Sequence, residues 1–149
     1  MNKLIFSFCG LLMLIACATM ENYSSEVTVK RKINSNSYEL TGNGYSKNSE
    51  SAISEAERNI FNIILFQGVA GSDLEIPMVP DESKAKSDKS SYYEGLIDKK
   101  GYRKFITKRS NTSTKIVKGG YSATTTLTVN YGALRKDLEQ NGVIRKFGF

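Results

Sequence analysis

Residues 48–68 read NSESAISEAERNIFNIILFQG, and this stretch has the strongest helix pattern in the chain. Asn48 or Ser49 is predicted to cap its N-terminus, because a short polar side chain satisfies an N–H group of the first turn. Glu50 follows in that turn, where the helix dipole favours negative charge. Gly68 lies beyond the last turn, in the C′ position that favours glycine. The predicted buried face consists of Ala52, Ile53, Ala56, Ile60, Ile63 and Ile64.

The other positions of this helix are predicted to face water. They include Glu55, Glu57, Arg58 and Asn59. Glu50 and Glu57 share a face, and a rise of about 1.5 Å per residue separates them by about 10 Å. We therefore interpret the acids as a solvated helix face and not as a catalytic pair. The alanines on the buried face let the helix lie close to a sheet.

The clearest strand is YSATTTLTVN, residues 121–130. One of its faces is predicted to carry Tyr121, Ala123, Thr125, Leu127 and Val129, and the other Ser122, Thr124, Thr126 and Thr128. This alternation and the β-branched residues favour a sheet with one wet face. Gly119-Gly120 predicts a hairpin turn before this strand, with residues 102–119 as the extended partner.

Two more strands are predicted earlier in the chain. Residues 26–33 alternate between apolar and polar side chains, and a second strand starts at Tyr38 after a turn at residues 34–37. Gly42-Asn43-Gly44 is too short for a phosphate-binding loop and is predicted to form a tight turn.

The remaining segments are less regular. Residues 72–91 contain both prolines and a charged, serine-rich run, which predicts a mobile loop. A short helix is expected around residues 92–97, and a second helix over residues 131–142, followed by an edge strand in the tail 143–149. The inward side chains of that second helix are Tyr131, Leu134 and Leu138.

These elements predict one α+β domain over residues 26–149. We expect an antiparallel sheet of about four or five strands, with one long helix and one or two shorter helices packed on it.

Three parts of this pattern carry a resemblance to a known family: the strand ending in glycines at residues 40–44, the alanine-rich helix at 52–61, and the strand running into a helix at 127–144. Together they resemble the Lpp-twenty family of small bacterial lipoproteins and the related N-terminal domain of the flagellar assembly protein T. The resemblance implies an envelope-anchored accessory or assembly domain, and it brings no catalytic motif to this chain.

Residues 1–16 predict a lipoprotein signal peptide. Lys3 supplies a positive charge, and residues 4–16 form an uncharged apolar run that is shorter than the roughly 20 residues of a membrane-spanning helix. The run leads into Leu14-Ile15-Ala16-Cys17, which resembles the lipobox of bacterial lipoproteins. The resemblance implies cleavage before Cys17, with a diacylglycerol and a further acyl chain on this residue.

Residues 17–25 are then expected to form a lipidated tether. Each buried methylene contributes about 0.8 kcal/mol, so more than one acyl chain holds a protein stably at the membrane. Ala18, where an aspartate would favour the inner membrane, points by resemblance to the outer membrane. The alternative is an ordinary secretory peptide with a coincidental cysteine. Cys9 lies inside the apolar run and is expected to leave with the peptide.

Composition excludes several kinds of chemistry. The chain has no His, and its two cysteines are Cys9 and Cys17. Disulfides, Cys/His zinc sites, cysteine nucleophiles and His-based triads are therefore excluded after residue 17. We expect no cofactor apart from the lipid on Cys17. The formal net charge of +6 suits phospholipid head groups, lipopolysaccharide or peptidoglycan, whereas nucleic acid is not an expected partner of an exported chain.

One segment concentrates this positive charge. Its six basic residues are Lys99, Lys100, Arg103, Lys104, Lys108 and Arg109. Such a cluster fits docking on anionic lipid head groups, on an acidic protein or on a glycan. The alternative is a solvated strand in which lysines protect a sheet edge from pairing with another chain.

Two features of the sequence allow a catalytic interpretation. Ser83 and Lys86 fit the S-x-x-K motif of serine acyltransferases, but the companion motifs are absent and the match is interpreted as chance. A small envelope enzyme that works with carboxylates alone, such as a glycan hydrolase, would rely on Glu55, Glu57 and Asp98. The favoured interpretation is a non-catalytic binding, scaffold or assembly domain anchored in the cell envelope, and a surface-exposed adhesin or antigen is a third possibility.

Overall fold

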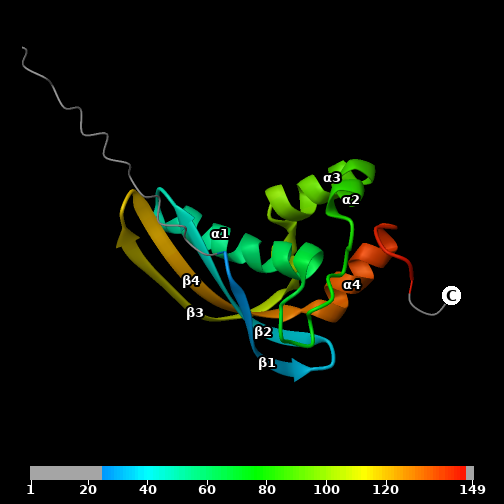
Figure 1. Ribbon diagram of the computed structural model, residues 1–149, viewed down its shortest axis with the longest axis horizontal. Coiled ribbons are helices and arrows are strands. Elements are labelled where there is room, and N and C mark those ends of the chain that lie inside the picture. The colour runs from blue at the N-terminus through cyan, green and yellow to red at the C-terminus, as the bar shows by residue number, and fades with distance from the viewer. Residues whose placement is uncertain (1–24, 147–149) are drawn as a thin grey trace, which may run out of the picture.

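The computed structural model describes residues 25–146, which form a four-stranded antiparallel sheet with helices on one of its faces (Figure 1). The sheet order is β1-β2-β4-β3. Its strands are β1 Val27–Asn34, β2 Ser37–Ser46, β3 Ile106–Val117 and β4 Gly120–Asn130. The predicted α+β class is confirmed.

The first and the last helix lie where the sequence pattern predicts them. The helices of the described residues are α1 Ser49–Asn62, which continues into the π-helix Ile63–Gln67; α2 Glu82–Asp88; α3 Ser90–Tyr93, which continues into the π-helix Glu94–Asp98; the 3-10 helix Gly101–Phe105; and α4 Tyr131–Gln140. Figure 1 shows α1 lying along the sheet, with α2, α3 and α4 gathered at one end of the molecule. The predicted long helix and C-terminal helix are both confirmed.

The predicted caps are also present. The Asn48 side chain accepts a hydrogen bond of 2.8 Å from the Ser51 N–H, so Asn48 is the N-cap of α1. Gly68 has a φ of 75°, a conformation that costs glycine little and other residues more. Asn130 ends β4 and caps α4, since its side chain accepts from the Ala133 N–H at 2.9 Å. The strand therefore passes into the helix without a loop.

The core lies between α1 and the sheet. Leu40, Leu127 and Val129 from the two central strands are fully buried against Ile60 and Phe61 of α1. The Phe61 ring stacks on Tyr102, with centroids 4.8 Å apart and planes inclined by 28°. Aromatic pairs in this geometry contribute about 0.5–1.5 kcal/mol beyond the area that they bury.

The glycines of β2 are not a turn, as the sequence suggested, but the surface on which α1 rests. Gly42 and Gly44 lie inside the strand, paired with Thr125 and Ala123 of β4. A Cβ on Gly44 would collide with the backbone at Ala52 and Ala56 of α1. Only glycine leaves room for the helix backbone to come this close to the strand. The predicted tight turn was therefore wrong: the glycines allow contact between helix and sheet and do not reverse the chain.

The segment predicted as a loop, residues 72–91, contains helix. Glu82–Asp88 form α2, capped by the Asp81 side chain, which accepts from the Lys84 N–H at 2.9 Å. No residue of α2 is buried, so the helix has no apolar face by which the sequence would reveal it. Before it, four apolar side chains are buried against the rest of the core: Val69, Leu74, Met78 and Val79.

Three smaller differences concern the second half of the chain. Gly101–Phe105 is a 3-10 helix and not the start of the extended partner strand. The hairpin turn consists of Lys118 and Gly119, because Val117 pairs with Gly120. Residues 143–146 form no strand, and residues 147–149 lie outside the described part.

We predict that Gly44→Ala will lower the free energy of unfolding by about 3 kcal/mol or more, because the added methyl group must push α1 away from the sheet. The measurement is chemical denaturation followed by circular dichroism. Gly95→Ala is the matched control: nothing lies within 4 Å of a Cβ at that position, so its stability should stay near wild type. Equal stability of the two variants would contradict the close contact.

Candidate functional site

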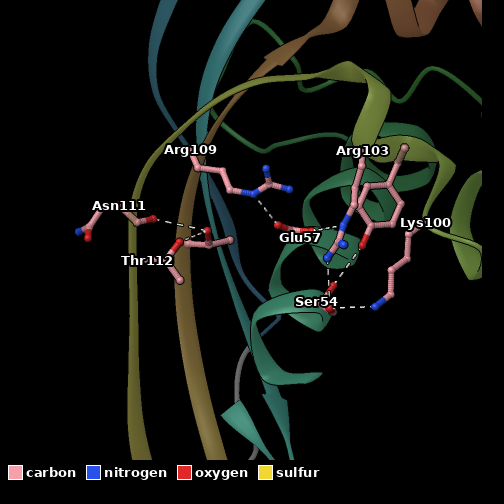
Figure 2. A network of polar contacts seen from close by, with 9 residues as sticks. Ser54, Glu57, Lys100, Arg103, Arg109, Asn111 and Thr112 are labelled. Atoms are coloured by element: carbon pink, nitrogen blue, oxygen red, sulfur yellow. Dashed lines mark hydrogen bonds and ion pairs between the residues drawn. The ribbon is translucent and has the colours of Figure 1, made fainter. Parts of the chain in front are cut away.

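The most concentrated group of charges surrounds Glu57 on α1 (Figure 2). Its side chain is only 2 % exposed. One carboxylate oxygen accepts from Arg103 Nε and the other from Arg109 Nε, each at 2.9 Å. A buried carboxylate is costly unless it is paired and hydrogen-bonded, and here both oxygens have a cationic donor.

A second group of contacts surrounds Ser54, one turn earlier on α1. Its hydroxyl accepts from Lys100 Nζ at 3.1 Å and from Arg103 Nη2 at 3.3 Å. The Tyr102 hydroxyl donates to the Ser54 carbonyl at 3.3 Å. The 3-10 helix is therefore fastened to α1 by both side-chain and backbone contacts, as Figure 2 shows.

Glu57 was predicted to face water, and that prediction was wrong. Helical periodicity alone places it beside the apolar face, but its partners come 46 and 52 positions later in the chain. Arg103 and Arg109 cover the Glu57 carboxylate when the 3-10 helix and β3 pack against α1. The signal in the sequence was indirect: a carboxylate at the margin of a buried face and a basic segment that needed counterions.

The six basic residues of segment 99–109 do not form one patch. Four have carboxylate partners, on three different elements: Lys99 with Glu94, Arg103 and Arg109 with Glu57, and Lys104 with Asp137. Lys100 donates to Ser54, and Lys108 lies exposed on β3. Much of the charge that the sequence offers to an anionic partner is therefore already paired within the fold.

The three carboxylates of the enzymatic alternative are separated as well. Glu55 and Asp98 line an open polar pocket of about 290 Å³, while Glu57 belongs to the arginine cluster. Within the pocket, Arg58 donates to Glu55 at 2.6 Å, and this hydrogen bond raises the pKa of the guanidinium. Arg58 Nε is buried without a hydrogen-bond partner among the described residues. Glu55 and Asp98 thus line the pocket as two acids, beside Arg58.

The S-x-x-K motif lies on α2. Lys86 Nζ donates to Glu82 at 2.6 Å and sits 4.9 Å from the centre of the Phe66 ring. Ser83 is exposed. The lysine is therefore engaged with a carboxylate and an aromatic face, and the arrangement gives no reason to revise the interpretation as chance.

Asp137 of α4 forms a third polar cluster. It accepts from the Tyr92 hydroxyl and from Lys104 Nζ, both at 2.7 Å. Burial and the contact with Asp137 raise the pKa of Tyr92 well above its usual range, and burial raises the pKa of Tyr93 to about 12. Both phenols are neutral at physiological pH, so the cluster acts as a structural contact between α3 and α4.

The face of the sheet opposite α1 carries polar side chains and is covered by no described helix (Figure 1). Thr41 and Thr126 share a hydrogen bond of 2.8 Å across β2 and β4, and Thr124 donates to the Asn43 side chain at 2.7 Å. Ser113 extends the second of these rows onto β3, through its pairing with Thr124. We call this surface the open face; its side chains offer hydroxyl and amide groups in regular rows.

The described residues contain neither a candidate membrane-spanning helix nor a candidate metal site. No helix among residues 25–146 is long and apolar enough to cross a membrane. Within the same range, no three His, Cys, Asp or Glu side chains are grouped in a way that would hold a metal ion. Cys17, the predicted lipidation site, lies outside the described residues.

Comparison with protein-family models, curated proteins and solved structures found no match for the chain. The resemblance to the Lpp-twenty family therefore stays a prediction from the sequence.

We predict that Glu57→Gln will lower the free energy of unfolding by about 2 kcal/mol. Breaking a fully buried ion pair costs about 3–5 kcal/mol, but the two arginines are partly solvated and regain water contacts. Thermal and urea unfolding measure the change. Glu50→Gln, on the exposed side of the same helix, should be near neutral. If the two variants lose stability equally, Glu57 is not the anchor described here.

Proposed function

We propose that this chain is a lipid-anchored, non-catalytic binding domain of the bacterial cell envelope. Cys17 carries the diacylglycerol and acyl chains, the following residues form the tether, and the α+β domain presents the open face to an envelope component. Ala18 favours the outer membrane as the location.

The observation that carries the binding role is the open face. Glu39 on this face is held by Arg31 at 2.9 Å and by Ser110 at 2.8 Å, and the contact with Ser110 lowers the pKa of Glu39. The neighbouring hydroxyl and amide groups pair with one another across the strands, and their remaining hydrogen-bonding capacity faces away from α1. Such a surface suits recognition of a partner by hydrogen bonds, whereas it provides no recess to enclose a reacting group.

A small envelope enzyme is the second candidate, and the pocket with Glu55 and Asp98 favours it. Against it, the Arg58 guanidinium lies 2.6 Å from Glu55 and holds that carboxylate as an ion pair. One oxygen of that carboxylate is therefore already engaged with the guanidinium.

We predict that the wild-type chain incorporates labelled palmitate and loses residues 1–16, and that Cys17→Ser abolishes both changes. The thiol of Cys17 is the acceptor for the lipid, and cleavage of such precursors follows lipidation. Metabolic labelling and mass spectrometry of the purified protein measure the two events. Cys9→Ser is the matched control and should keep the label, because Cys9 leaves with the peptide. A labelled Cys17→Ser protein would overturn the proposed anchor.

We predict that a photo-crosslinking amino acid at Ser113 on the open face captures one dominant envelope component in living cells, and that the same amino acid at Ser83 on α2 does not. Both positions are exposed, so the control differs only in its place on the molecule. Mass spectrometry identifies the adduct. Equal capture from both positions would contradict a specific open-face partner.

The same assay separates the two candidate functions. Glu55→Gln combined with Asp98→Asn should leave the crosslink at Ser113 unchanged in a binding domain. Glu57 is unchanged in the double variant, as in the wild-type protein, because we expect its replacement to destabilise the fold. Loss of capture with the double variant would move the active surface to the pocket.

A further inference from the structure

We propose that the tip of the β3–β4 hairpin is a second membrane contact, and that it lies on the anionic phospholipid surface to which the chain is anchored. We define the hairpin tip as residues 115–121. This inference rests on the lipid anchor proposed above, and it deepens that proposal by naming which end of the domain faces the lipid.

The hairpin tip has the composition of a segment that lies at a membrane surface. Ile116 is 79 % exposed, and Lys115 and Lys118 flank the Ile116-Val117 pair. Apolar side chains enter the boundary between head groups and acyl chains, while neighbouring lysines keep their ammonium groups at the phosphates. No carboxylate occurs within the hairpin tip.

Tyr45 of β2 adds an aromatic side chain beside the turn. It is 36 % exposed, and its hydroxyl donates to the Lys118 carbonyl at 3.4 Å. Gly119 takes a φ of 84°, and a Cβ at this position would lie 3.0 Å from the Tyr45 hydroxyl. Tyrosine is enriched at membrane interfaces because its ring is apolar and its hydroxyl polar.

The strand register places the start of β1, which the proposed tether precedes in the chain, at the same end of the sheet. Val27, the first residue of β1, pairs with Gly42, and the neighbouring strand β2 runs on from there to Ser46, which pairs with Tyr121 of the hairpin tip. Since β1 is antiparallel to β2, the chain enters the sheet from the side of the hairpin tip. At about 3.4 Å per residue, residues 18–26 span at most about 30 Å, so the anchor keeps this end near the lipid.

Charge at this end is positive but modest. Lys47 follows β2 there, and two carboxylates, Glu26 before β1 and Glu50 in the first turn of α1, also lie at this end. Three lysines thus face two carboxylates. The contact is expected to prefer anionic lipid, and the insertion of Ile116 is expected to contribute most of its strength.

Ile76 shows that exposure alone does not make such a contact. It is 80 % exposed, but it follows Glu75 and lies near the other end of α1, where the Met78 N–H donates to the Ile64 carbonyl. Ile76 lies far from the start of β1, and residues 72–80 around it contain no lysine. It therefore does not belong to the same surface as Ile116. Ile76 is therefore the matched control for Ile116.

The test uses residues 17–149 with Cys17→Ser, which contain every strand and helix described above and carry no acyl chain. The chain has no Trp, so Ile116→Trp and Ile76→Trp each introduce a single fluorophore. The probes are vesicles of equal parts phosphatidylethanolamine and phosphatidylglycerol, and vesicles of phosphatidylcholine alone. Emission of Ile116→Trp should move to shorter wavelength with the anionic vesicles, and emission of Ile76→Trp should not.

Vesicle sedimentation gives a second readout that needs no fluorophore. Ile116→Asn should weaken binding to the anionic vesicles about fivefold to tenfold, whereas Ile76→Asn should leave it unchanged. Lys115→Ser with Lys118→Ser should reduce the preference for anionic over zwitterionic vesicles. Circular dichroism confirms that each variant is folded, which we expect because the substituted side chains are exposed.

An unchanged Ile116→Trp spectrum, equal shifts at both positions, or equal binding to the two vesicle types would overturn the inference. These results are independent of lipidation, since the test protein carries no anchor. Failure of the palmitate experiment with a positive vesicle result would remove the anchor but keep the surface. The reverse outcome would keep the anchor and remove the surface.

Discussion

The close approach of α1 to β2 is the constraint on which the rest of this structure depends. Gly42 and Gly44 present bare backbone to the helix, and Ala52 and Ala56 present the smallest side chains that a helix can offer in return. This contact sets the distance between helix and sheet along half of α1. Toward the other end of the helix the layers hold larger side chains, such as Phe61, and the second group of helices completes the core there. A wedge-shaped interior follows, narrow at the hairpin end and wide at the end of α2, α3 and α4.

Glu57 fastens this arrangement along one side. Its two arginine partners lie on the 3-10 helix and on β3, so a single carboxylate joins α1 to two consecutive elements that come much later in the chain. Burying the carboxylate has a desolvation cost, which the two charge-assisted hydrogen bonds offset. The arginines remain half exposed, which lowers the cost of their own desolvation. The basic segment therefore serves the fold first, and its charge is no longer free in the way that the linear sequence suggested.

The proposed functions occupy the surfaces that the fold leaves unused. The open face keeps its hydroxyl and amide groups because α1 covers only the opposite side of the sheet. The hairpin tip keeps Ile116 exposed because the rest of the described chain leaves this side chain uncovered. Because β1 begins at the same end of the sheet as the hairpin tip, an anchored domain would have its hairpin tip at the membrane surface. The open face would then be turned along the membrane toward a partner. The wide end, where α2, α3 and α4 gather, would lie farthest from the lipid.

The sequence by itself determined the secondary structure at the places where the pattern is local. Helical spacing and the Asn48 cap identified α1, and strict alternation identified β4. The apolar spacing of residues 131–142 identified α4, which follows β4 directly. The predicted targeting segment and the predicted lipidation of Cys17 likewise rest on neighbouring residues alone. Only the tertiary structure decided that the glycines of β2 are an interlayer contact, that α2 forms within a polar segment, and that Glu57 is buried. The glycines meet a helix that begins only after β2 has ended, α2 has no buried residue and so no apolar period, and the partners of Glu57 lie 46 and 52 positions away. The physical reason is that burial and ion pairing are properties of the assembled surfaces, which periodicity in one segment does not contain.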